Sequence, residues 1–264
     1  MMLKVPATAL RALGVAAMLA SPTGTFADMP TFSTEIVEMA DGTRLHLRVG
    51  GEGPAVVLLH GYTQTGDMWT PVAEALRADH KVIVPDLIGI GGSVPTTDES
   101  YSKAAQARDL AEALDVIGVG EVAVVGHDIG SMIAYGFAAE FPERTCRLVL
   151  MEAPLPGIGP WDQIRANPRA WHMNFHGAVA EALTEGRERV WLDKFWDGFA
   201  ADPYAIDEKQ REHYTQAYAR PGAMRAGFSQ FAAMERDAED NAGFAVRTLA
   251  MPILAVGVRR GRAN

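Results

Sequence analysis

The sequence predicts an α/β protein, with a doubly wound, mostly parallel sheet and an all-helical insertion before the last strand. Five short and nearly continuous apolar runs are typical of strands buried on both faces of a parallel sheet. They cover residues 55–61, 81–86, 121–128, 147–152 and 251–257. Helical stretches separate the first four runs, which favours strand–helix alternation. Between residue 155 and about residue 245 the strands vanish, and four of the five tryptophans lie there.

The individual elements follow the chain in a simple order. Residues 34–38 and 44–49 flank Asp41-Gly42, a hairpin signal, and predict a small antiparallel start. Helices are expected at 68–78, 102–117 and 131–140, and within the insertion in EALTEGRERVWLDKFW and DEKQREHYTQAYA. We therefore divide the chain into a core at 32–154, a helical cap at 155–245 and a returning core strand at 246–257.

Composition excludes several classes of partner. The 264 residues carry a net charge of −9, which disfavours nucleic acid and anionic membrane surfaces. The stretch DLIGIGGS lacks the glycine spacing of a dinucleotide loop, and we expect no cofactor and no metal. Cys146 is the single cysteine, so no internal disulfide can form. A homodimer is left open.

The first 27 residues have the order of a secretory signal peptide. Lys4 and Arg11 come early, an uncharged stretch at 12–20 follows, and small residues lead to a cleavage position after Ala27. We expect a periplasmic or secreted protein. The alternative is a leader that stays attached.

Polar side chains stand where four of the predicted strands end. His60-Gly61-Tyr62 follows one strand, Asp86 and Asp128 end two others, and Glu152 ends a fourth. In an open α/β sheet these ends share one rim, where functional groups gather. The sequence therefore brings one histidine and three carboxylates together.

Asp128 occupies the central position of VGHDIGSM, a strand-to-helix turn that in many hydrolases presents a serine between two glycines. Gly126 and Gly130 relieve crowding in such a turn. Asp128 is either a nucleophile or the N-cap of the following helix. The backbone N–H groups of Tyr62 and Ile129 could form an oxyanion hole beside it.

The stretches HGYTQTGDMW, DLIGIGGS, VGHDIGSMIAYGFAAEFPERTCRLVLMEAPLPG and AWHMNFHG resemble the α/β-hydrolase superfamily, in particular its bacterial epoxide hydrolases and related haloalkane dehalogenases. The resemblance covers roughly residues 32–257. It implies that Asp128 attacks an epoxide or haloalkyl carbon of a small-molecule substrate and forms an alkyl ester. A carboxylate is already anionic at neutral pH and suits displacement at saturated carbon. Glu152 matches the acid that orients the base histidine.

The resemblance also implies a substrate site beneath the cap. His172 matches a cap histidine that helps to hold the epoxide oxygen, and Trp171, His176 and Phe231 are assigned to substrate binding. His60 joins this set, although a buried histidine that shapes its loop fits it better. Phe231 stands where relatives have a tyrosine, and it has no hydroxyl to donate. The residues that could compensate from nearby cap helices are Tyr204, Tyr214 and Tyr218.

The base histidine that the resemblance places beyond the last strand is missing. All seven histidines precede Met251, and after MPILAVG the chain reads VRRGRAN, which we interpret as an aberrant tail at 258–264 of a truncated chain. We expect an exposed sheet edge at residues 253–256 and alkylation of Asp128 without turnover. Two alternatives stay open: a haloalkane or haloacid dehalogenase, and a non-catalytic remnant or binding protein. Ile129 offers no side-chain donor for a halide, which favours the epoxide.

Overall fold

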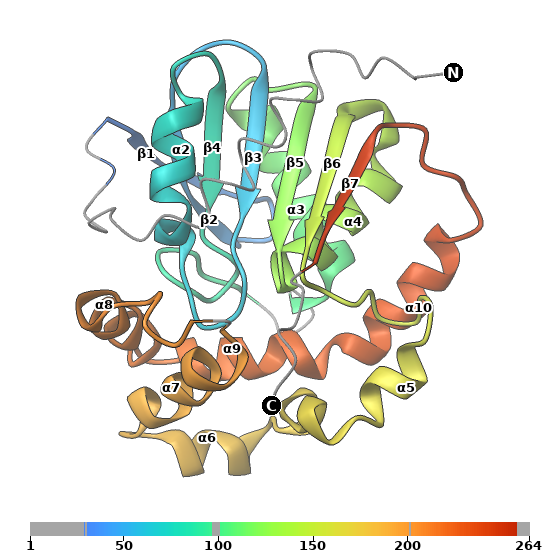
Figure 1. The fold of residues 1–264 in the computed structure, drawn as a ribbon. Helices are drawn as coiled ribbons and strands as arrows, with labels where there is room; N and C mark the ends of the chain where they lie inside the picture. Colours follow the sequence, from blue (N-terminus) through green and yellow to red (C-terminus); the bar gives the residue numbers. More distant parts are fainter. Residues whose placement is uncertain (1–28, 30, 97–100, 201, 258–264) are drawn as a thin grey trace, which may run out of the picture.

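A computed structural model of the chain describes residues 29, 31–96, 101–200 and 202–257. Within these residues a seven-stranded sheet has the order β1-β2-β4-β3-β5-β6-β7 (Figure 1). The strands are β1 (Ser33–Glu38), β2 (Arg44–Gly50), β3 (Ala55–Leu59), β4 (Lys81–Pro85), β5 (Val122–His127), β6 (Thr145–Met151) and β7 (Ile253–Val256).

The sheet changes from antiparallel to parallel along its width. β1 pairs antiparallel with β2, and β2 pairs antiparallel with β4. From β4 through β3, β5 and β6 to β7 every pairing is parallel. This arrangement confirms the predicted α/β class and the antiparallel start.

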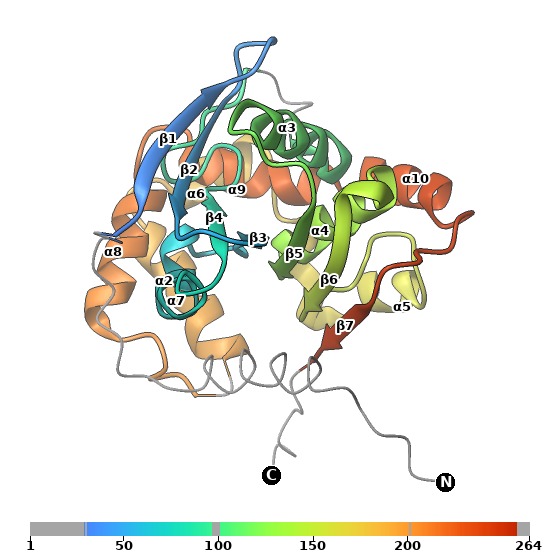
Figure 2. The ribbon, with the colours of Figure 1, turned by 90° about the horizontal axis from the view of Figure 1, so that it is seen from above.

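Both faces of the central strands are buried, as the continuous apolar runs predict. Val57 and Leu59 of β3 belong to one apolar cluster, and Val56 and Leu58 to a second cluster across the sheet. The first cluster includes residues of α3 (Lys103–Val116) and α4 (Ile129–Glu140), and the second includes residues of η1 (Gly66–Trp69) and α2 (Thr70–Leu76). Figure 2 shows α2 and the α3–α4 pair on opposite sides of the sheet. A short helix, η3 (Pro142–Arg144), connects α4 to β6.

The remaining helices lie between β6 and β7 and form the cap. They gather beyond the carboxyl ends of the parallel strands, below the sheet in Figure 1. They are α5 (Trp161–Arg165), η4 (Pro168–Asn174), α6 (Ala178–Thr184), α7 (Glu188–Phe199), α8 (Glu208–Tyr218), α9 (Ala223–Ala232) and α10 (Met234–Phe244).

Two cap helices replace the long segment that begins EALTEGRER. The helical conformation is interrupted between α6 and α7 at Gly186, whose φ of 70° is not helical. By contrast, α8 begins as its sequence predicts: Asp207 and Gln210 form a reciprocal capping box that satisfies two backbone N–H groups.

A buried polar network joins the cap to the core. Lys103, at the start of α3, forms an ion pair of 3.0 Å with Asp237 of α10, and its ammonium group also donates to the carbonyl of Gln230 in α9. Gln106 donates to the Gln230 side chain at 2.9 Å. Since the ion pair is almost completely buried, separating its partners would leave an uncompensated charge.

One edge of the sheet is apolar and exposed. β7 is the edge strand among the described residues, and Ile253 and Leu254 are 49% and 39% exposed. This agrees with the exposure expected there. The expected signal peptide at 1–27 and the tail at 258–264 lie outside the described residues. No helix in the described ranges is both long and apolar enough to cross a bilayer.

Asp109 of α3 gives a pH-dependent contribution to stability. Burial, followed by the charges of Asp41 and Glu112, raises the pKa of Asp109 to about 6. A carboxyl group whose pKa is higher in the folded state stabilises the fold below about pH 4 and loses this contribution as the pH rises through about 6. Asp109→Asn should therefore increase the free energy of unfolding at pH 8 by roughly 1–2 kcal/mol, discounted for partial exposure.

Chemical denaturation of the wild type and Asp109→Asn at pH 8 and pH 4.5 checks this expectation. The gain should shrink markedly at pH 4.5, where the wild-type carboxyl is mostly protonated. An equal gain at both pH values would contradict it. Glu121→Gln, an exposed substitution nearby in sequence, should stay within about 0.5 kcal/mol at both.

Candidate active site

The turn at Asp128 is sterically demanding. Asp128 adopts φ 52° and ψ −122°, an uncommon conformation for a non-glycine residue. A Cβ on Gly126 would lie 2.2 Å from the carbonyl oxygen of Gly130, and one on Gly130 would lie 2.4 Å from that of Leu59. Both contacts are with backbone, which cannot rotate away. The two glycines allow α4 to start directly against the ends of β3 and β5.

Hydrogen bonds fasten this turn to the neighbouring strand. The N–H of Asp128 donates to Met151 O at 2.9 Å. The buried Ser131 hydroxyl lies 2.7 Å from Gly126 O and accepts from Met151 N at 2.8 Å. The conformation of Asp128 is thereby held by β5, β6 and the first turn of α4 together.

The Asp128 carboxylate is directed to the core loop after β3. The N–H of Tyr62 donates to Asp128 Oδ2 at 2.9 Å, and Asp128 does not cap α4 through its side chain. Asp128 therefore occupies the N-cap position of α4, but its carboxylate is used by Tyr62 and does not cap the helix. Ile129 is buried in the first turn of α4, where backbone N–H groups lack intrahelical partners. Of the expected oxyanion hole, the Tyr62 donor is in place on Oδ2.

His60 shapes the loop that carries Tyr62. Its ring is fully buried, with Nδ1 2.9 Å from Gly61 O and Nε2 accepting from the N–H of Leu87 at 2.9 Å. Burial lowers the pKa of His60, and the nearby Asp86 charge opposes this shift. Both ring nitrogens are thus engaged by backbone, which favours loop shaping over contact with substrate.

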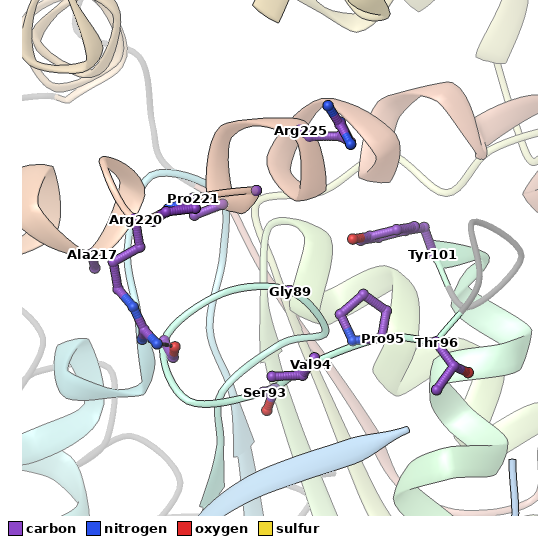
Figure 3. Close-up of a pocket in the computed structure, with 13 residues that line it drawn as sticks. Gly89, Ser93, Val94, Pro95, Thr96, Tyr101, Ala217, Arg220, Pro221 and Arg225 are labelled. Atoms are coloured by element: carbon purple, nitrogen blue, oxygen red, sulfur yellow. Dashed lines mark hydrogen bonds between the residues drawn. The ribbon is translucent and has the colours of Figure 1, made fainter. Parts of the chain in front are cut away.

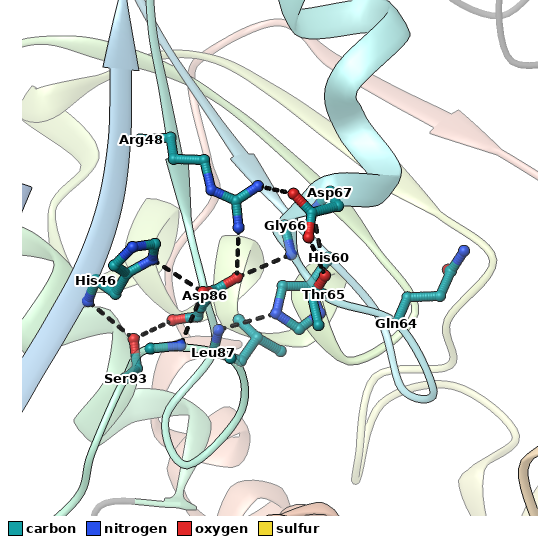
Figure 4. Close-up of polar contacts among 12 residues, drawn as sticks. His46, Arg48, His60, Gln64, Thr65, Gly66, Asp67, Asp86, Leu87 and Ser93 are labelled. Atoms are coloured by element: carbon teal, nitrogen blue, oxygen red, sulfur yellow. Dashed lines mark hydrogen bonds and ion pairs between the residues drawn. The ribbon is translucent and has the colours of Figure 1, made fainter. Parts of the chain in front are cut away.

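Asp86 anchors the same region through its carboxylate (Figure 4). It is 2% exposed, and its carboxylate accepts from Gly66 N and Gly92 N, each at 3.0 Å. His46 Nδ1 lies 2.9 Å away and an Arg48 nitrogen 3.4 Å away. Although burial alone would raise it, the pKa of Asp86 is held far below its usual range by His46 and the Arg48 charge.

A second carboxylate connects this anchor to the cap. Asp67 accepts from Arg48 and from Thr65, and its Oδ2 lies 2.7 Å from His213 Nε2 of α8. Tyr218, also of α8, accepts from the N–H of Thr63 at 2.8 Å. Its hydroxyl is therefore used in holding the loop after Tyr62.

An aromatic cluster lies beside the turn. The Tyr62 ring packs edge-on against Phe231 at 4.7 Å and Phe195 at 5.2 Å between ring centroids. His172 contacts the same two rings at 5.5 and 5.2 Å. Burial lowers the pKa of His172, and the charge of Asp128 opposes that shift. The structure thus brings His172, Phe231, Tyr62 and Asp128 to one region.

Two of the expected substrate-binding residues lie farther out. Trp171 is 44% exposed and packs against Phe175 and Trp191. His176 is exposed on the loop after η4. Of the tyrosines considered as donors, Tyr204 is 88% exposed and Tyr214 is fully buried.

Trp191 is a site residue that the sequence did not indicate. From α7 it donates its indole N–H to the Tyr62 hydroxyl at 2.8 Å. Gly227 of α9 allows the cap to approach from the other side, because a Cβ there would lie 2.9 Å from Tyr62 Cε2. The sequence of this amphipathic helix contains several aromatic residues, and it does not indicate which of them contacts the core.

Glu152 follows β6 and lies on the same rim. It has a φ of 58°, its N–H donates to Val256 O at 3.0 Å, and its side chain is exposed. All seven histidines belong to the described residues, and none of them forms a hydrogen bond or ion pair with Glu152 in the structure. The described part of the chain therefore contains no histidine oriented by this carboxylate.

A separate cavity of about 490 Å³ lies between the loop after β4 and helices α8 and α9 (Figure 3). Tyr101, Arg220 and Arg225 are among its lining residues, and none of the predicted site residues lines it. Within the described ranges no group of three or more His, Cys, Asp or Glu side chains could hold a metal ion.

Comparison with known proteins places these features in context. A family described as the alpha/beta hydrolase fold matches residues 54–217. The chain is 31% identical to the soluble epoxide hydrolase of Corynebacterium sp. over 237 residues, which are 85% of this chain and 82% of that protein. It is 30% identical to the fluoroacetate dehalogenase of Burkholderia sp., over 76% of this chain and 69% of that protein.

Solved structures agree with these relatives. Wild-type Cfl2 from Burkholderia cenocepacia superposes with a TM-score of 0.76 at 31% identity, over 86% of this chain and 80% of that one. The ligand-free epoxide hydrolase CorEH superposes with a TM-score of 0.77 at 27% identity, over 86% and 82%.

The Asp86 network should dominate the stability of the rim. In Asp86→Asn, an amide N–H₂ would face backbone N–H groups, and the charge that balances Arg48 would be lost. We expect the free energy of unfolding to fall by about 3 kcal/mol or more, which corresponds to a decrease in Tm of roughly 6–12 °C. Differential scanning calorimetry measures this change.

His213→Gln is the matched control, because it alters the exposed end of the same network. Its ring is 49% exposed, and loss of its contact with Asp67 should cost at most about 1 kcal/mol. Equal destabilisation by the two substitutions would refute the anchoring role of Asp86.

Proposed function

Since the chain belongs to the alpha/beta hydrolase family and is related to epoxide hydrolases and dehalogenases, we propose that it opens epoxides by forming an alkyl ester on Asp128. The observation that carries this proposal is the hydrogen bond of 2.9 Å from Tyr62 N to Asp128 Oδ2. It holds an aspartate at the centre of the turn in a defined orientation. The other carboxylate oxygen, Oδ1, is then the atom that attacks the substrate.

The arrangement suits both parts of an ester-forming step. A carboxylate needs no base to displace at a saturated carbon. As Oδ1 bonds to the substrate, Oδ2 becomes the ester carbonyl oxygen, and Tyr62 N already lies beside it. If water then attacks the ester, the same N–H can stabilise the negative charge that develops on Oδ2.

Hydrolysis of the ester is the second step, and it requires an activated water molecule. A water molecule at neutral pH needs a general base to attack efficiently, and histidine is the usual one. Glu152 is positioned on the rim, but no histidine contacts it in the structure. We therefore propose that alkylation of Asp128 is fast compared with release of the product.

Dehalogenation is the second candidate, since a fluoroacetate dehalogenase is among the relatives. Displacement of a halide is assisted by donors that receive the departing anion. The residue after the nucleophile is Ile129, which is buried and has no polar side-chain atom. This observation favours the epoxide, and release of halide against formation of a diol distinguishes the two reactions.

Intact-mass spectrometry after incubation with 1,2-epoxyhexane tests the proposal. The wild type should gain one equivalent of the epoxide, and peptide mapping should place it on Asp128. Asp128→Asn should show at least about 100-fold slower adduct formation, because a neutral amide is a poor nucleophile.

Glu152→Gln is the control variant. It lies on the same rim but outside the ester-forming step, so its adduct should form at a rate within about threefold of the wild type. Rapid diol production without any adduct, or an adduct of equal size on Asp128→Asn, would overturn the proposed course.

A further inference from the structure

We propose that the Tyr62 side chain donates its hydroxyl proton to the epoxide oxygen during ring opening, in place of the hydroxyl that Phe231 lacks. This inference rests on the proposed function and assigns Tyr62 a second role besides its backbone contact with Asp128. The departing epoxide oxygen carries negative charge as its bond to carbon breaks, so a nearby donor lowers the barrier.

The hydroxyl of Tyr62 has its proton available. It accepts a hydrogen bond from Trp191 Nε1 at 2.8 Å, and its own proton has no acceptor among the described residues. An indole N–H can only donate, so the direction of this bond is unambiguous. The bond from Trp191 orients the phenol and stabilises negative charge on its oxygen.

The backbone N–H and the ring contacts of Tyr62 hold this residue close to the Asp128 carboxylate. Its N–H contacts Asp128 Oδ2, and its ring is fixed between Phe231, Phe195 and Tyr218 at centroid distances of 4.7, 5.2 and 5.9 Å. Only 7% of the residue is exposed. A donor that is already positioned and desolvated requires little reorganisation when charge develops beside it.

The identity of residue 231 makes the assignment specific. The Phe231 ring contacts both Tyr62 and His172, and Phe195 contacts the same pair. The two polar rings thus lie against the same two apolar rings. The Tyr218 hydroxyl already accepts a hydrogen bond from Thr63 N. It could replace Tyr62 in this role only by releasing the loop after Tyr62.

Protonation favours this role at neutral pH. Burial raises the pKa of Tyr62, only partly offset by the hydrogen bond from Trp191, so the phenol carries its proton. In the reaction, Asp128 Oδ1 forms a bond to an epoxide carbon, the carbon–oxygen bond of the ring breaks, and its electron pair remains on oxygen. That oxygen takes the proton of Tyr62, and the resulting phenolate regains a proton from water.

The rate of Asp128 alkylation measures the role directly, with two electrophiles of equal chain length. Epoxide opening by 1,2-epoxyhexane needs a proton on the leaving oxygen, whereas 1-iodohexane releases iodide, which needs none. Tyr62→Phe keeps the backbone donor and should slow alkylation by the epoxide about 100-fold. Alkylation by the iodide should change less than about threefold.

Phe231→Tyr in the Tyr62→Phe background is the rescue variant, since it returns a hydroxyl to the neighbouring ring. It should recover at least about tenfold of the lost rate with the epoxide. The comparison also controls for folding, because Tyr62→Phe leaves the Trp191 N–H without its acceptor. A misfolded variant would lose reaction with both electrophiles and would not be rescued.

Three outcomes overturn the inference or its premise. Unchanged epoxide alkylation in Tyr62→Phe would show that the hydroxyl takes no part. Equal slowing with both electrophiles, in a variant whose circular dichroism spectrum and Tm match the wild type, would show that Tyr62 only positions Asp128. If the wild type forms no adduct with either compound, the proposed function itself fails, and this inference fails with it.

Discussion

The site depends on the close approach of helix α4 to the end of β3. The Gly130 backbone lies so near the carbonyls of Leu59 and His60 that an added Cβ would come within 2.4 and 2.5 Å of them. This approach places Asp128 within hydrogen-bonding distance of the loop that follows β3. The N–H of Tyr62 can then hold the Asp128 carboxylate at 2.9 Å. A larger residue at 130 would separate the helix from the strand and part the two groups.

Two carboxylates on the rim show how surroundings decide a role. Asp86 is 2% exposed, and its oxygens lie within hydrogen-bond or ion-pair distance of backbone N–H groups, His46 and Arg48. A carboxylate with all its lone pairs engaged is stabilised as an anion and is a poor nucleophile. Asp128 is partly exposed and accepts from Tyr62 N on one oxygen. Both aspartates end parallel strands, yet one carboxylate is fully engaged in holding loops, whereas the other accepts from Tyr62 N on one oxygen and leaves Oδ1 for the role that we propose.

The strands, their buried faces and the turn at Asp128 could be predicted, because each depends on local sequence. Continuous apolar runs indicate strands such as β3, and glycines at 126 and 130 indicate the sharp turn. The cap was harder to predict. The break at Gly186 interrupts a segment with continuous amphipathic character, and the bond from Trp191 to Tyr62 joins residues 129 positions apart. Which face of α7 meets the core follows from tertiary packing, and helical periodicity alone does not reveal it.

The buried ion pair of Lys103 and Asp237 gives the cap two kinds of attachment to the core. Near α9 and α10 the cap is joined to α3 by an ion pair of 3.0 Å and by glutamine contacts, all away from water. Near η4 and α7 it meets the Tyr62 loop mainly through ring edges and two indole hydrogen bonds. Ring edges can slide at small cost, whereas a buried charge cannot be exposed singly. The cap is therefore anchored to the core by buried charge at α9 and α10, and by aromatic packing and neutral hydrogen bonds near η4 and α7.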